Sequence, residues 1–294
     1  MKIAFIGKRR QTERDIRLIN KFMKQLADKG VDIAIELRLL RSLRDAGKIE
    51  VNHFTEFDGD AFDADFVISI GGDGTLLRSA TTVAMKHIPI VGVNTGHLGF
   101  LADEMLDNAS AITSQLLAGD YAIEDRAMLE VSLHDNQPGI TFPGSPYALN
   151  EVAVLRQDTA SMISVNARLD GMDVADYQGD GLIISTPTGS TAYNLSVGGP
   201  IIEPSAPAFV ISPIAPHALT MRPLVVSHHR TIELSVYSRS NSYRLTLDGR
   251  AAILPLTTAL TVKKAEFPVR IVHFPGSNFF DTLRAKMLWG VSKR

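Results

Sequence analysis

The sequence has no cysteine in its 294 residues. This absence excludes a disulfide framework, a cysteine-ligated metal and a thiol nucleophile. No apolar run approaches the ~18 residues that a membrane-spanning helix needs, and the amino terminus shows no secretory signal pattern. The net charge is only −2 at pH 7, which argues against a general nucleic-acid binder, because such proteins are usually clearly basic. We therefore expect a globular, cytoplasmic protein.

The first third of the chain alternates between strand and helix patterns. A capping box formed by Thr12 and Asp15, for example, precedes a helical pattern that Gly30 ends. The expected strands are residues 3–7, 31–36, 66–70 and 88–94, and the expected helices follow Thr12 and cover 37–47, 76–85 and 109–117. Such alternation predicts a Rossmann-like α/β domain with a parallel sheet. Sheets of this kind bind ligands beyond the carboxyl ends of their strands.

From Leu129 onward, apolar residues alternate with polar ones between turn signals. This period-two pattern predicts a mostly antiparallel β-sandwich. The last segment, residues 278–290, returns to a helical pattern. We therefore predict an α/β domain over residues 1–122, an all-β domain over 123–276, and a helix within 277–294 that packs back on the first domain.

The stretch FVISIGGDGTLLRSA, residues 66–80, joins a buried strand to a helix that we expect to begin near Leu76. Its glycines allow positive φ and close approach to a ligand, and its N–H groups form a natural anion site. A carboxylate at Asp73 is unfavourable beside phosphate unless it has a task. Asp73 is a general base, a ligand for Mg²⁺, or an N-cap on a tight turn. The chain has neither a Walker loop nor a GxGxxG fingerprint.

Two further motifs place polar groups at strand ends. DGLIISTPTGSTAYNLSVGGP, residues 180–200, runs from a strand into a turn with four hydroxyl side chains around Gly189, and Tyr193 is placed to stack on a base. Turns rich in serine and threonine also occur without ligands, but this segment is long. Asn150–Glu151 pairs an amide with a carboxylate, which together supply the donor and acceptors that a ribose needs.

Taken in order, these motifs resemble those of the NAD kinase family. The matching segments are GGDGT at residues 71–75, NTGHLGFL at 94–101, Asn150–Glu151 and the segment at 180–200. GGDGT alone is shared with diacylglycerol and sphingosine kinases and, more loosely, with phosphofructokinases, whereas TPTGSTAY is highly specific. The resemblance spans nearly the whole chain. It implies transfer of the γ-phosphoryl group of ATP to the 2′-hydroxyl of the adenosine ribose of NAD, which gives NADP and ADP.

The resemblance also implies roles for individual residues, with Asp73 as the base that takes the hydroxyl proton. The positions that match dinucleotide contacts are Asp73, Gly74, Arg78, Asn150, Glu151, Asp180, Thr188, Thr191, Ala192, Tyr193, Asn194, Leu195 and Ser196. Asp180, of the same or a neighbouring subunit, reaches the nicotinamide end, and Tyr193 lies near adenine. Mg²⁺ accompanies ATP, with no dedicated protein metal site. Family members form homodimers or homotetramers.

Two positions depart from the family pattern. Gln178 stands where some members carry a basic residue, and Arg250 replaces a glutamine that is often found there. Arg250 either adds a phosphate contact or biases product binding. The cations after the first strand, Lys8, Arg9 and Arg10, form a solvated turn or contact the ATP phosphates.

Two other functions stay open at this point. A lipid kinase shares GGDGT but should lack TPTGSTAY, and it usually carries an acidic residue where this chain has Leu76, Leu77 and Arg78. A non-enzymatic NAD(P) sensor would not need Asp73, so that aspartate favours the enzyme. The sequence does not decide between ATP and inorganic polyphosphate as donor, or whether NADH is accepted.

Overall fold

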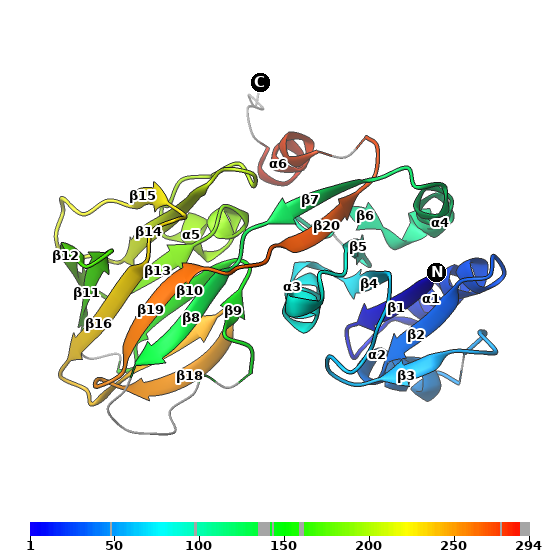
Figure 1. Ribbon diagram of the computed structural model, residues 1–294, viewed down its shortest axis with the longest axis horizontal. Helices are drawn as coiled ribbons and strands as arrows, with labels where there is room; N and C mark the ends of the chain where they lie inside the picture. The colour runs from blue at the N-terminus through cyan, green and yellow to red at the C-terminus, as the bar shows by residue number, and fades with distance from the viewer. Residues whose placement is uncertain are drawn as a thin grey trace. The chain divides into compact units, whose positions relative to one another are not determined.

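The computed structural model describes residues 1–47, 49–96, 99–134, 142, 144–158, 162–276 and 278–288 (Figure 1). The chain divides into two compact units, one of Met1–Asp125 with Val269–Arg294 and the other of Arg126–Pro268. Each unit has its own hydrophobic core. None of the described helices is long and apolar enough to cross a membrane. His97, within the NTGHLGFL motif, and residues 289–294 of the expected last helix lie outside the described residues.

The first unit is built on a mainly parallel sheet. Its strand order is β3-β2-β1-β4-β5-β20-β7, and β6 pairs with β5. The strands are β1 (Lys2–Gly7), β2 (Asp32–Glu36), β3 (Thr55–Phe57), β4 (Phe66–Gly71), β5 (Ile90–Asn94), β6 (Glu104–Met105), β7 (Ala122–Arg126) and β20 (Val269–His273). Strands β1 to β5 pair in parallel, and β6 and β20 are both parallel to β5. The predicted α/β class is therefore confirmed.

Helices connect or follow these strands. They are α1 (Glu13–Ala27), α2 (Leu37–Asp45), α3 (Asp73–Val83), α4 (Ala109–Ala118) and α6 (Phe279–Met287). Helix α1 begins at the predicted capping box, where Thr12 Oγ1 accepts the Asp15 N–H at 3.1 Å and the Asp15 carboxylate accepts the Thr12 N–H at 3.2 Å. Its buried face carries Ile16, Ile19 and Met23, which join the core of this unit.

The carboxyl ends of the central strands form one edge of the sheet. Gly7 lies beside Ile70, and Gly71 beside Asn94, so β1, β4 and β5 end at a similar level. Strand β2, next to β1, ends at Glu36. Because Gly71 begins GGDGT, the glycine loop lies at the edge where doubly wound sheets bind ligands.

The second unit contains two six-stranded sheets, of order β15-β14-β13-β10-β17-β18 and β12-β11-β16-β19-β8-β9. The strands are β8 (Leu129–His134), β9 (Tyr147–Ala148), β10 (Glu151–Arg156), β11 (Ile163–Leu169), β12 (Met172–Gly179), β13 (Gly181–Ser185), β14 (Ala208–Ile214), β15 (Leu224–Ser227), β16 (Ile232–Ser238), β17 (Ser242–Leu247), β18 (Arg250–Pro255) and β19 (Ala259–Lys264). Every pairing within them is antiparallel. One apolar core draws on both sheets, so the predicted sandwich is confirmed.

Two strands belong to a different unit from the one that the predicted domain limits gave them. The limits at 122/123 and 276/277 placed β20 and all of β7 except Ala122 in the β domain, whereas both strands belong to the sheet of the first unit. Ile271 of β20 pairs in parallel with Ile90 of β5. An alternating pattern identifies a strand but not the sheet that it joins, so these limits could not be read from the sequence.

Candidate active site

The GGDGT loop leads directly into α3, which begins at Asp73. The sequence suggested a start near Leu76, so the helix has an additional first turn. The Gly72 carbonyl accepts the N–H groups of Thr75 and Leu76 at 2.8 and 3.1 Å, which closes this turn. Contrary to expectation, none of the loop glycines, all of them described, has positive φ. Gly71 is required by space instead, because a Cβ there would lie 2.2 Å from Thr75 Oγ1.

The Asp73 carboxylate is held by the backbone of the loop after β5. It accepts the N–H groups of Phe100 at 2.9 Å and of Leu101 and Ala102 at 3.1 Å. Hydrogen bonds to a charged acceptor are stronger than neutral ones, so they fix the carboxylate firmly. The loop approaches this closely because residue 99 is glycine: a Cβ on Gly99 would lie 2.0 Å from Asp73 Oδ1. Within the NTGHLGFL motif, no local pattern distinguishes Gly99 from the other positions.

A cavity of about 400 Å³ opens beside Asp73 and is lined by two lysines. Lys8, just after β1, donates from Nζ to Thr95 Oγ1 at 2.9 Å. Lys286, on α6, places Nζ 3.9 Å from Asp73 Oδ2 and 4.6 Å from the centre of the Phe100 ring. The sequence suggested Lys8 as a phosphate contact but missed Lys286. A carboxylate and two ammonium groups thus face a space of small-ligand size.

A partly buried ion cluster holds the same loop. His273, in β20, lies between two carboxylates, with Nδ1 3.0 Å from Asp103 Oδ2 and Nε2 2.8 Å from Glu124 Oε2. Burial alone lowers the pKa of His273, but the two carboxylates outweigh it and raise the pKa to about 9. Because Asp103 follows Ala102, this cluster ties the loop around Asp73 to β7 and β20.

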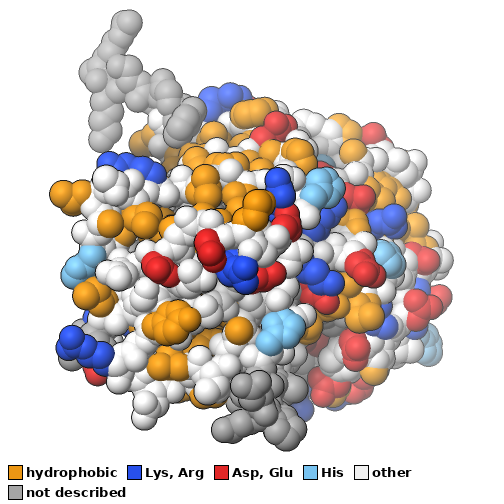
Figure 2. All heavy atoms as spheres, turned by 60° about the vertical axis from the view of Figure 1, so that its left-hand side comes forward, with side chains coloured by type: hydrophobic (Ala, Val, Ile, Leu, Met, Phe, Trp, Pro, Cys, Tyr) orange, Lys and Arg blue, Asp and Glu red, His pale blue; other side chains and the backbone are white. Residues whose placement is uncertain are grey.

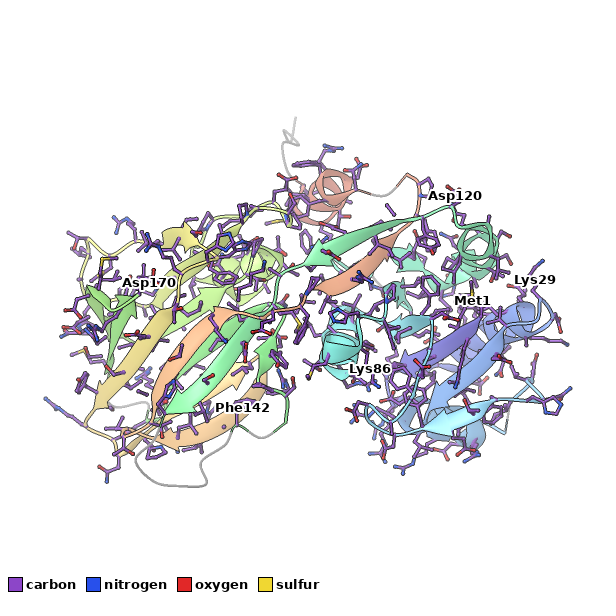
Figure 3. The ribbon with its side chains drawn as sticks, in the orientation of Figure 1. Met1, Lys29, Lys86, Asp120, Phe142 and Asp170 are labelled. Atoms are coloured by element: carbon purple, nitrogen blue, oxygen red, sulfur yellow. The ribbon has the colours of Figure 1, made fainter. Side chains whose placement is uncertain are left out.

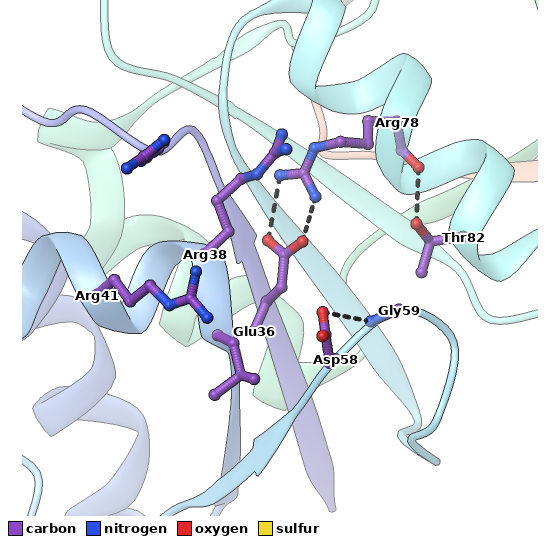
Figure 4. A pocket seen from close by; sticks show the side chains of 9 residues that line it. Glu36, Arg38, Arg41, Asp58, Gly59, Arg78 and Thr82 are labelled. Atoms are coloured by element: carbon purple, nitrogen blue, oxygen red, sulfur yellow. Dashed lines mark hydrogen bonds and ion pairs between the residues drawn. The ribbon is translucent and has the colours of Figure 1, made fainter. Parts of the chain in front are cut away.

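Arg78, further along α3, points toward the ends of β1 and β2. Its guanidinium forms a two-pronged ion pair with Glu36 (Figure 4). It also donates to the Gly7 carbonyl at 2.7 Å. The Glu36 side chain is only 10% exposed. The sequence suggested that Arg78 contacts the dinucleotide, whereas here it contacts the first unit itself.

In the second unit, Asp248 shapes the Asn150–Glu151 motif. Its carboxylate accepts the N–H groups of Leu149, Asn150 and Glu151 at 2.7, 2.8 and 3.1 Å. Asp248 lies in the turn between β17 and β18 with φ 47°, a conformation that aspartate adopts more readily than most residues. Asp248 was not among the predicted site residues, although the Asp-Gly pair in LDGRAAI is a turn signal that could have revealed it.

The side chains of Asn150 and Glu151 are buried, yet each has an acceptor without a partner. Within the described residues, Asn150 Oδ1 and Glu151 Oε2 make no hydrogen bond. Burial and the charge of Asp248 raise the pKa of Glu151 to about 7, although a hydrogen bond from the Tyr193 backbone opposes the shift. Unpaired buried acceptors are costly unless a ligand supplies donors, and ribose hydroxyls are donors of this kind.

The TPTGSTAY segment folds against this pair. Thr186 Oγ1 donates to the Leu149 carbonyl at 2.5 Å, and a Cβ on Gly189 would lie 2.1 Å from the Asn150 carbonyl oxygen. Tyr193 is 38% exposed, which leaves its ring accessible to a base. The elements of the segment are a 3-10 turn at Thr188–Thr191 and a short helix, α5, at Tyr193–Ser196.

The remaining predicted contacts in this segment differ in their accessibility. Asn194 is fully buried: its amide donates to the Ser190 and Pro200 carbonyls, and its Oδ1 accepts the Ser212 hydroxyl at 2.6 Å. It therefore holds the segment together. Thr188 accepts from Arg126 at 3.4 Å. Partly buried or exposed positions are Gly74, Thr191, Ala192, Leu195 and Ser196.

Asp180 does not lie near Asn150–Glu151 within this chain. Glu151 pairs with Ser185 at one end of β10 and β13, whereas Leu155 pairs with Gly181 at the other. Four residues of strand separate these ends by roughly 14 Å. The Asp180 carboxylate forms an ion pair with Arg156 at 2.9 Å.

The guanidinium of Arg250 is hydrogen-bonded within the second unit. It donates to the Ser145 carbonyl at 2.6 Å and to the Tyr147 carbonyl, and it lies 5.8 Å from the ring centre of Phe142 (labelled in Figure 3). In this structure, Arg250 therefore anchors the segment before β10. Gln178 pairs with Ser164 in the β11–β12 ladder.

We predict that Glu151→Gln makes stability less dependent on pH. The folded-state pKa of Glu151 is about 7, compared with an ordinary value of 4.5. Its contribution is therefore complete below about pH 4.5 and is lost as the pH rises through 7. In urea unfolding, the variant should lose less stability between pH 4.5 and 7.5 than the parent does. Glu203→Gln, at an exposed glutamate of the same unit, should lose as much stability as the parent over this pH range. If E151Q also loses as much as the parent, the raised pKa of Glu151 is contradicted.

Comparison with known proteins identifies the family. The ATP-NAD kinase N-terminal domain model matches residues 3–121, and the C-terminal domain model matches residues 149–274. The NAD kinase of Bacteroides fragilis is 42% identical over 294 residues, which cover 100% of both chains. The NAD kinase of Porphyromonas gingivalis is 43% identical over 294 residues, which cover 100% of this chain and 99% of the other.

Two solved structures are similar over almost the whole chain. Yeast NADH kinase, complexed with NADH, has a TM-score of 0.89 at 20% identity and covers 100% of this chain and 89% of its own; at this identity the likeness is one of fold. An NAD kinase from Archaeoglobus fulgidus, in complex with ATP, has a TM-score of 0.73 at 29% identity, with 98% and 99% covered. With both domain models matched in order and relatives 42–43% identical along its full length, the chain belongs to the ATP-NAD kinase family.

Proposed function

We propose that this chain transfers the γ-phosphoryl group of ATP to the 2′-hydroxyl of the adenosine ribose of NAD, giving NADP and ADP, with Asp73 as general base. Family membership supports the reaction class. The role of Asp73 is supported by the position of its carboxylate, which three backbone N–H groups hold beside a cavity lined by two lysines. A lipid kinase is disfavoured, because both domain models are those of NAD kinases.

The hydrogen bonds of Asp73 leave room for a substrate. An ionised carboxylate offers about four lone-pair sites, and the described residues occupy three of them. The remaining site accepts the 2′-hydroxyl proton, as a general base requires. Because the amides belong to the backbone, the carboxylate cannot turn away during the reaction.

Phosphoryl transfer depends mainly on positioning and charge neutralisation. Lys8 and Lys286, which line the Asp73 cavity, supply two positive charges for the transferred group. Within the described residues, no group of three His, Cys, Asp or Glu side chains could hold a metal ion. Mg²⁺ usually keeps several waters and binds substrate phosphates, so it would arrive with ATP and need no dedicated protein site, which leaves Asp73 available as the base. When bound, Mg²⁺ would neutralise phosphate charge.

We assign the dinucleotide to the polar groups of the second unit. The unpaired acceptors of Asn150 and Glu151 receive ribose hydroxyls, and Tyr193 stacks on adenine. The two neighbouring structures were solved with NADH and with ATP, respectively, so related folds accept both ligand classes of the proposed reaction.

We further propose a cytoplasmic homodimer or homotetramer, as the family resemblance implies. The distance of Asp180 from Asn150–Glu151 along β13 supports this assembly, because Asp180 would then serve a dinucleotide of a neighbouring subunit. Light scattering coupled to size-exclusion chromatography tests it, and a monomer at all concentrations would exclude it.

The test of the proposed function is NADP formation from ATP, Mg²⁺ and NAD. Asp73→Asn keeps the size of the side chain but removes the base, so kcat should fall by about 10²–10⁴-fold, with near-normal NAD binding by calorimetry. An equally active variant would remove Asp73 from the mechanism. No product from the parent, with NAD still bound, would instead identify a sensor.

Gly99→Ala should impair the same step without touching a charged group. The new Cβ would lie 2.0 Å from Asp73 Oδ1, so the carboxylate or the loop must shift, and a displacement of about 1 Å can cost 10²-fold in rate. Gly96→Ala is the matched control, because among the described residues its Cβ would have only Asn94 Oδ1 nearby, at 3.9 Å. Steady-state kcat for NADP formation is the measurement, and equal losses in the two variants would contradict the packing argument.

A further inference from the structure

A second cavity in the first unit, of about 390 Å³, gathers positive charge (Figure 4). It lies beside the ends of β1 and β2. The charged residues of its lining are Arg9, Glu36, Arg38, Arg41, Asp58 and Arg78. Four guanidinium groups therefore face two carboxylates, which leaves an excess of two positive charges.

The arginines of this cavity differ in whether their guanidinium groups have a partner. Arg78 is paired with Glu36. Among the described residues, by contrast, the guanidinium groups of Arg9, Arg38 and Arg41 make no hydrogen bond or ion pair, and Figure 4 shows Arg38 and Arg41 near the Arg78–Glu36 pair. Exposed arginines commonly lie on solvated surfaces, but here they converge on one hollow. Like charges held close together repel one another, and a bound anion would relieve this repulsion.

The cavity lies on the same sheet edge as Asp73. In the order β2-β1-β4, neighbouring strands are ~4.8 Å apart, so the ends of β2 and β4 are separated by about 10 Å. The GGDGT loop follows β4, while α2, with Arg38 and Arg41, follows β2. Lys8 and Arg9 follow β1, which lies between β2 and β4. Lys8 lines the Asp73 cavity, and Arg9 lines the second cavity, which we call the arginine cavity. A chain of phosphates can extend along this edge from one cavity to the other.

We propose that the arginine cavity binds the phosphate chain of the phosphoryl donor, behind the group that is transferred at Asp73. This inference rests on the proposed function. Guanidinium groups bind phosphate oxygens in a two-pronged geometry, so the site takes a linear polyphosphate, whether it belongs to a nucleoside triphosphate or to inorganic polyphosphate.

The test compares two double variants of equal charge. Arg38→Gln/Arg41→Gln removes two guanidiniums of the cavity, whereas Arg14→Gln/Arg17→Gln removes two from α1, each with a side chain 61% exposed. The first variant should raise KM for ATP by about tenfold or more with KM for NAD unchanged, and inorganic tripolyphosphate should inhibit it that much more weakly than the parent. The control should match the parent in all three respects.

Parallel assays with ATP and with inorganic tripolyphosphate as donor separate the two sources. If the parent forms NADP from ATP alone, the cavity is assigned to a nucleotide. If it forms NADP from both donors, and KM for both rises equally in R38Q/R41Q, the cavity is assigned to the phosphate chain of either donor. An unchanged KM for ATP, or an equal rise in the α1 control, would overturn the proposal.

A failure of the proposed function is distinguishable from a failure of this inference. If the parent forms no NADP, calorimetric titration with tripolyphosphate decides. Binding lost in R38Q/R41Q but kept in the α1 control supports the cavity as a polyphosphate site, and equal binding by both variants overturns it. Thermal melting of each variant checks that it folds, which we expect because Arg38 and Arg41 have no partners to lose among the described residues.

Discussion

The contact between the Asp73 carboxylate and the backbone N–H groups of the loop after β5 determines the geometry of the first unit's site. The contact requires glycine at position 99, since any Cβ there would collide with the carboxylate. It also requires that the loop stay in place, which the His273 cluster secures through Asp103, the residue after Ala102. Lys286 then closes the cavity from a distant part of the chain. The Asp73 carboxylate is thus positioned by backbone rather than by flexible side chains.

The second unit uses the same interaction for a different purpose. Asp248 accepts three successive N–H groups, those of residues 149–151, and so fixes the backbone that carries the side chains of the motif. The arrangement has an electrostatic cost: burial raises the pKa of Asp248, although the N–H groups oppose this, and its charge helps to raise the pKa of Glu151. A ligand with hydroxyl donors offsets part of that cost.

The sequence predicted those features that depend on local pattern. The capping box at Thr12 and Asp15, the alternation of strands and helices, and the position of GGDGT after a buried strand all follow from neighbouring residues. The need for glycine at position 99 did not, because the crowding there comes from Asp73, which is remote in sequence. The membership of β20 in the parallel sheet and the approach of Lys286 to Asp73 are likewise contacts between distant segments. No periodicity encodes them.

The net charge of −2 describes the chain as a whole and carries no information about phosphate recognition at a single cavity. Figure 2 shows acidic and basic side chains interspersed over one face of the molecule, without one sign prevailing. Exposed charges separated by more than ~8 Å are largely screened at physiological salt, so a bound anion responds to the groups lining its own cavity. Along the edge formed by β2, β1 and β4, the charged residues that line the two cavities are mostly arginine and lysine. A weakly acidic protein can therefore hold a polyanion there, and can place one carboxylate, Asp73, next to phosphate.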